Sequence, residues 1–133
     1  MKTRKTSLLL SLLLVLATSP MFAHHSTRGI YEETEIEITG KVLSWRFINP
    51  HPYLTIEAED ENGTLQEWDV SYGGAAVVHL TRQGYTDSTF KEGDIIVVKG
   101  RPARAESVFG ILIEGGHPTW PDGSSVVEGG SMF

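Results

Sequence analysis

Apolar and polar residues alternate along most of the chain between residues 35 and 114, which is the pattern of β-strands with one buried face. The first alternation covers residues 35–42 and then changes phase, because Leu43, Trp45 and Phe47 continue on the other parity. A long first strand with a bend or bulge at this change of phase explains the pattern.

Two further strands follow, joined by a tight turn. The Asn-Pro-His-Pro segment at residues 49–52 ends the first strand, because neither proline can donate a hydrogen bond to a sheet. Tyr53–Glu59 and residues 64–72 then alternate, and the Asn-Gly pair in the turn at residues 60–63 is a strong hairpin signal. The positions expected to face the core are Leu54, Ile56, Ala58, Trp68, Val70 and Tyr72.

One short helix is predicted after the third strand. Residues 75–82 place Ala76, Val77 and Leu80 on one side of a helix, and Gly84 supplies a C-terminal stop. The pattern therefore changes here from a period of two to a helical period.

The last two strands are predicted at residues 95–100 and 108–113. The first of them begins with four consecutive apolar residues, which is typical of a strand covered on both faces. The order β-β-β-α-β-β is that of a five-stranded, OB-like Greek-key barrel with its helix between strands three and four. We therefore predict an all-β fold of this kind, with a plain antiparallel sandwich as the alternative.

The start of the chain has the features of a secretory signal peptide, predicted at residues 1–23. A basic beginning precedes ten apolar residues at 8–17, too few to cross a bilayer as a helix. Cleavage after residue 23 would place the protein in the periplasm or outside the cell. The mature chain then divides into an N-terminal arm at 24–34, the barrel at 35–114 and a Gly/Pro/Ser-rich tail at 115–133.

The net charge and the absence of cysteine exclude or disfavour several kinds of binding partner and site. Without the three basic residues of the leader, the mature chain has eight basic and 17 acidic residues, a formal charge of −9. This charge disfavours nucleic acid as a partner. The absence of cysteine excludes disulfides, thiolate metal sites, cysteine nucleophiles and a lipoprotein anchor. We expect no membrane span after the leader has been removed.

Three of the five histidines are candidates for a shared metal site. Cleavage after Ala23 would give His24 a free α-amine, and an amine and an imidazole on one residue form a ready chelate. His51 lies in the Pro-flanked loop that borders the usual binding surface of an OB barrel. The His24 chelate with a second imidazole from His51 or His25 would suit Cu(II) or another divalent ion. The alternative is that these histidines are exposed and bind nothing.

The other two histidines carry weaker expectations. His79 lies on the predicted helix, where a surface or partly buried histidine is the simpler interpretation. His117 lies at the root of the tail, and it reaches a site only if the tail folds back.

The large aromatic residues offer a second kind of site. Core packing accounts for most of them in a small domain. Trp45 and Phe47, however, lead directly to His51, and with Tyr53 they are the candidates for a stacking surface for a sugar or another flat ligand.

The chain resembles a family of small exported bacterial proteins known only as a domain of unknown function. The resemblance runs from His24 to about Gly123. Its motifs are Ala-His-His-Ser at 23–26, Gly40, Val42, Trp45, Asn-Pro-His at 49–51, Trp68, Arg-Gln-Gly-Tyr at 82–85, residues 88–91, Gly-Asp at 93–94 and Pro-Asp-Gly at 121–123. The resemblance implies an exported, β-rich domain and no particular reaction. The chain departs from the family in its long tail and in Gly73-Gly74 before the helix.

Together these features favour an exported binding module over an enzyme. The first hypothesis is a module that holds copper or a related ion through His24 and His51, with His25 in support. The second is a metal-free barrel that binds a small ligand or an envelope protein. The third is a copper-dependent oxidative enzyme, since an N-terminal histidine chelate can also activate oxygen. No Gly-x-Ser-x-Gly elbow, His-Glu-x-x-His pair or phosphate loop is present.

Overall fold

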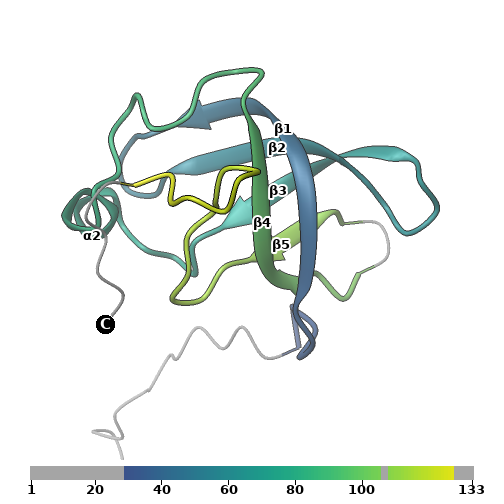
Figure 1. The fold of residues 1–133 in the computed structure, drawn as a ribbon. Coiled ribbons are helices and arrows are strands. Elements are labelled where there is room, and N and C mark those ends of the chain that lie inside the picture. The colour runs from purple at the N-terminus through teal and green to yellow at the C-terminus, as the bar shows by residue number, and fades with distance from the viewer. Residues whose placement is uncertain (1–28, 106–107, 128–133) are drawn as a thin grey trace, which may run out of the picture.

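The computed structural model describes residues 29–105 and 108–127. The predicted signal peptide, His24 and His25 lie outside these residues. Figure 1 shows the strands wrapped into a barrel with a short helix at one end.

Five strands close into the barrel in the order β1-β2-β3-β5-β4. The elements are β1 (Ile36–Arg46), β2 (Tyr53–Glu59), β3 (Leu65–Ser71), α2 (Val77–Arg82), β4 (Ile95–Pro102) and β5 (Gly110–Leu112). The prediction of an OB-like barrel with a helix between its third and fourth strands is confirmed. Because the sheet closes on itself, the sandwich alternative is excluded.

The first strand pairs with two neighbours. Its first half, from Ile36 to Lys41, is antiparallel to β4, and its second half, from Lys41 to Arg46, is antiparallel to β2. The register with β2 shifts between Val42 and Ser44, which is the irregularity that the change of phase predicted. Such a bulge bends the strand and increases its twist, so one strand can serve both sides of the barrel.

The core is formed by inward-facing positions of all five strands of the barrel. As predicted, Leu54, Ile56 and Ala58 are buried on β2, and Trp68 and Val70 are buried on β3. The buried positions contributed by the later strands are Ile96, Val98, Ile111 and Leu112. Alternation in the sequence therefore identifies the buried face of each long strand.

The segment predicted as a tail packs against the barrel over its described part, residues 115–127. Thr119 exchanges two backbone hydrogen bonds with Val97 of β4, at 2.8 and 3.0 Å. Pro118 and Val127 are buried, and Trp120 packs against the core. In Figure 1 this segment runs alongside β4. The segment thereby covers part of β4. The four consecutive apolar residues at the start of this strand predict that both of its faces are covered.

Closure of the barrel depends on a glycine in β4. A Cβ atom at Gly100 would overlap the carbonyl oxygen of Leu112 and lie 2.9 Å from its carbonyl carbon. We predict that Gly100→Ala lowers the free energy of unfolding by about 1–3 kcal/mol, because a backbone contact cannot relax as a side chain does. Urea denaturation measures the effect.

The matched control is Gly116→Ala. A Cβ atom there would meet only a methyl group of Ile113, at 3.7 Å. The control should stay close to wild type. Equal stability of the two variants would contradict the closure argument.

Candidate functional site

His51 lies in the loop between β1 and β2, and its side chain is exposed. Its Nδ1 atom is 3.3 Å from the carbonyl oxygen of Ala75. A carbonyl oxygen can only accept, so Nδ1 donates this bond and the neutral ring keeps its free lone pair on Nε2. The backbone of the same loop is tied to the helix, because the Val77 N–H donates to the Pro50 carbonyl at 3.4 Å. His51 is thus oriented with one nitrogen available to a ligand.

A groove of about 400 Å³ lies beside His51, where the start of β2 meets the end of β3. Its walls come from the segment before β1, the start of β2, the end of β3 and the connection between β4 and β5. Its lining includes the side chains of Ile30, His51, Tyr53, Asp69, Ser71 and Val108. The barrel thus brings together residues up to 80 positions apart in the chain, from Ile30 to Gly110.

The described part of the predicted N-terminal arm forms one wall of this groove. Its backbone is joined to the end of β4 by bonds from the Glu32 N–H to the Pro102 carbonyl, 2.8 Å, and from the Arg104 N–H to the Ile30 carbonyl, 2.9 Å. The Arg104 side chain adds a 2.8 Å bond to the Tyr31 carbonyl and a 3.3 Å ion pair with Glu32. These contacts therefore hold Ile30 and Tyr31 in the lining of the groove to which His51 also contributes.

The structure separates the three aromatic residues of the predicted stacking surface. Trp45 and Phe47 pack against the core, with ring centroids 5.4 Å apart. Tyr53 instead faces outward and lines the groove. The guanidinium of Arg46 lies over its ring, 4.7 Å from the centroid. Only Tyr53 of the three therefore remains a candidate for contact with a ligand in the groove.

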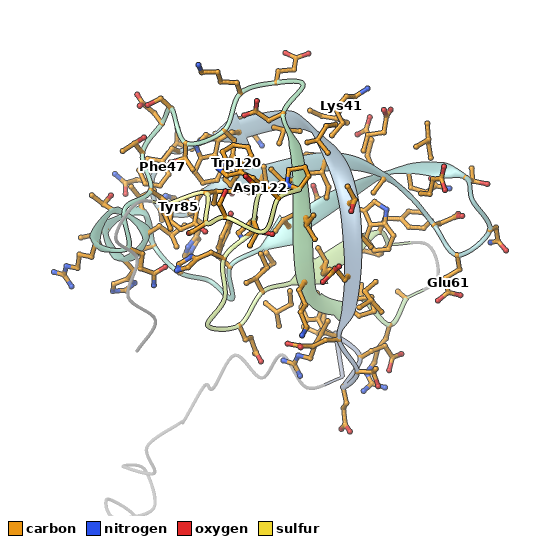
Figure 2. The ribbon with its side chains drawn as sticks, viewed as in Figure 1. Lys41, Phe47, Glu61, Tyr85, Trp120 and Asp122 are labelled. Atoms are coloured by element: carbon orange, nitrogen blue, oxygen red, sulfur yellow. The ribbon has the colours of Figure 1, made fainter. Side chains whose placement is uncertain are left out.

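Trp45 belongs to an aromatic cluster at the end of the barrel next to the helix. Its ring centroid is 5.2 Å from that of Phe90 and 6.1 Å from that of Tyr85, and its Nε1 donates to the Thr86 carbonyl at 2.8 Å. Figure 2 shows Phe47, Tyr85 and Trp120 close together at this end, far from Glu61 at the tip of the β2–β3 hairpin. Packing explains these side chains without a ligand.

His117 reaches this cluster because the tail does fold back. Its Nδ1 lies 2.9 Å from the hydroxyl oxygen of Tyr85, a fully buried side chain. Burial lowers the pKa of His117, and burial raises the pKa of the Tyr85 hydroxyl. The contact fixes the tail to the core and lies outside the groove.

No described group of three or more His, Asp or Glu side chains is placed to hold a metal ion. His79 is exposed on α2, in agreement with the simpler interpretation of that residue. A metal site built on His51 would therefore need donors outside the described residues, such as the predicted ligands His24 and His25. Asp69 and Val108 were not predicted as groove residues, because only the pairing of β3 with β5 brings them together.

The fold and the groove define a small OB-type barrel with a candidate binding face on its second and third strands. The chain belongs to a family of unknown function (DUF6152), whose sequence pattern matches residues 12–112. No curated protein and no solved structure matches the chain. Within residues 29–105 and 108–127, no helix is long and apolar enough to cross a membrane.

The contact between His117 and Tyr85 predicts a pH dependence of stability. Burial lowers the pKa of folded His117 below the ordinary 6.5, so the unfolded chain binds more protons in the window below that value. The stabilisation is complete above about pH 6.5 and is lost as the pH falls through this window. His117→Asn keeps an acceptor and cannot titrate, so it should flatten this part of the profile.

Urea denaturation between about pH 8 and pH 5 measures this change. His79→Asn, at an exposed site, is the matched control and should keep the wild-type profile. A profile for His117→Asn that still falls as steeply as wild type would contradict the assignment.

Proposed function

We propose that this protein is an exported binding module that holds copper or another divalent ion at the edge of the groove. The donors are the α-amine and imidazole of His24 and the Nε2 atom of His51, with His25 in support. The observation that carries the proposal is the orientation of the His51 ring by the Ala75 carbonyl.

A hydrogen bond at one ring nitrogen is the usual companion of metal ligation at the other. Donation from Nδ1 to a backbone carbonyl fixes the tautomer and the ring orientation, and it makes Nε2 the more basic ligand. His51 has this arrangement at 3.3 Å. The ring is exposed, so an ion can approach it from solvent.

The position of the arm supplies the second support. Ile30 lines the same groove as His51, and it is attached to the end of β4 through Arg104. Six residue steps separate Ile30 from His24, and an extended chain of that length spans about 20 Å. The predicted mature N-terminus is therefore within reach of the groove.

The chemistry of these donors favours copper. An amine and imidazoles are nitrogen ligands, and Cu(II) is the tightest binder among divalent first-row ions at such sites. The formal charge of −9 on the mature chain attracts cations in general. The ligands must be unprotonated to bind, so affinity should fall below about pH 6.

Metal-free ligand binding is the second candidate function. It is favoured by the apolar side chains exposed around the groove, Ile30, Tyr53 and Val108. This candidate needs neither His24 nor His25.

The metal proposal predicts that Cu(II) binding depends on the free N-terminus. Protein that begins at His24 should bind Cu(II) at least about tenfold more tightly than the same protein with an acetylated N-terminus, because acetylation converts the amine into an amide. Calorimetric titration at neutral pH against a competing chelator measures both affinities. Equal affinity of the two forms would exclude the His24 chelate.

The same titration tests the loop donor. His51→Ala should weaken Cu(II) binding at least about tenfold through the loss of one ligand. His79→Ala removes a second exposed imidazole from outside the groove and should change nothing. If both variants bind as wild type does, His51 is not a ligand.

A further inference from the structure

Three exposed apolar side chains from distant parts of the chain meet around the groove. Ile30, Tyr53 and Val108 are 58%, 48% and 54% exposed, and all three line it. Apolar side chains that gather on an exposed surface and are rimmed by polar residues often mark a binding site. The volume of about 400 Å³ also lies in the range of about 300–1,000 Å³ found for small-ligand sites.

Tyr53 provides a fixed aromatic surface in this groove. Arg46 is its partner across the β1–β2 ladder, and the guanidinium lies 4.7 Å from the ring centroid. This cation–π contact holds the exposed ring in place. The faces of aromatic rings carry partial negative charge, so they attract the weakly positive C–H groups on the face of a sugar ring.

Polar groups suited to hydroxyls lie beside Tyr53 on β3. The Asp69 carboxylate accepts one hydrogen bond, from the Thr55 hydroxyl at 3.2 Å, and a carboxylate can accept several more. Ser71 accepts a bond from the Gly73 N–H at 3.3 Å and keeps its own hydroxyl hydrogen to donate. Both side chains line the groove and alternate outward from the buried positions of β3.

The charged residues in and around the groove bear on whether it binds an oligonucleotide or an oligosaccharide. Its described lining contains one carboxylate, Asp69, and no lysine or arginine. Strands two and three and their neighbouring loops are the face on which OB barrels bind oligonucleotides or oligosaccharides. Arg46 beside Tyr53 and Arg104, which is paired with Glu32, lie outside this lining. Because the chain as a whole is acidic, a neutral chain of hydroxyls is favoured over a phosphate backbone.

We propose that the groove binds a neutral oligosaccharide, with a sugar ring on Tyr53 and its hydroxyls on Asp69 and Ser71. This binding requires no metal ion. It is therefore independent of the donors at residues 24–25.

The test is an NMR titration of ¹⁵N-labelled protein in the presence of a chelator. The probes are neutral hexasaccharides built from glucose in β-1,4 linkage, glucose in α-1,4 linkage and N-acetylglucosamine, with a galacturonate hexamer and a thymidine hexanucleotide as anionic counterparts. At millimolar concentration, at least one neutral hexasaccharide should shift the backbone amides of His51, Tyr53, Leu54 and residues 69–74. The anionic hexamers should not shift them.

Variants locate the contact. Tyr53→Ala should weaken binding about tenfold or more, whereas Tyr53→Phe keeps the ring and should bind as wild type does. Asp69→Asn should also weaken binding, because it removes a charged acceptor. Glu67→Gln, a matched change on the same strand but outside the groove, should have no effect.

Two results would overturn the proposal. One is the absence of shifts in the groove amides with all three neutral hexasaccharides, in wild-type protein whose spectrum is that of a folded barrel. The other is binding that Tyr53→Ala and Asp69→Asn leave unchanged. Because a chelator is present throughout, failure of copper binding affects neither outcome.

Discussion

The pairing of β1 with two different strands is the constraint on which this structure depends. One half of the strand lies against β4 and the other half against β2, so the strand must bend where the two halves meet. The register shift between Val42 and Ser44 provides the bend, and Gly40 permits the close approach of Ile56. A straight first strand would leave one of these edges unpaired and the barrel open.

The same bend positions both the aromatic cluster at one end of the barrel and the part of the groove formed by Tyr53. After the shift, Trp45 and Phe47 pack against the core and begin the aromatic cluster that Tyr85 and His117 complete. Arg46, between them in the chain, faces outward, and its guanidinium lies over the ring of Tyr53 at 4.7 Å from the centroid. A single irregularity therefore supplies both the packed end of the barrel and one side of the groove.

Strand content could be predicted from the sequence because alternation reports burial directly. The pattern locates β2 to the residue, and the change of parity indicates the bulge. The grouping of Tyr53 with Trp45 was misleading because the facing pairs are Arg46 with Tyr53 and Trp45 with Leu54. Alternation along β2 places Tyr53 on the face opposite the buried Leu54. The register that sets Trp45 opposite Leu54, however, is fixed across a loop and is not visible in either strand alone.

The tail was harder to predict for a similar reason. Its Gly, Pro and Ser residues indicate irregular structure correctly, but irregular structure can still pack. What fixes the segment is a set of contacts with residues far away in the chain, such as His117 with Tyr85 and Thr119 with Val97. Amino-acid composition, from which the start of the tail was predicted, does not reveal such contacts.

The groove shows why the candidate site depends on closure of the barrel. Ile30 is held by the end of β4, Val108 precedes β5, and Asp69 lies where β3 pairs with β5. None of these residues is near another in sequence, and each is placed by a strand whose inner face is buried. His51 and Tyr53, which are close in sequence, share only one wall. A ligand that contacts Tyr53 together with Ile30, Asp69 or Val108 therefore binds only the closed barrel. Its affinity depends on barrel closure as well as on the side chains that touch it.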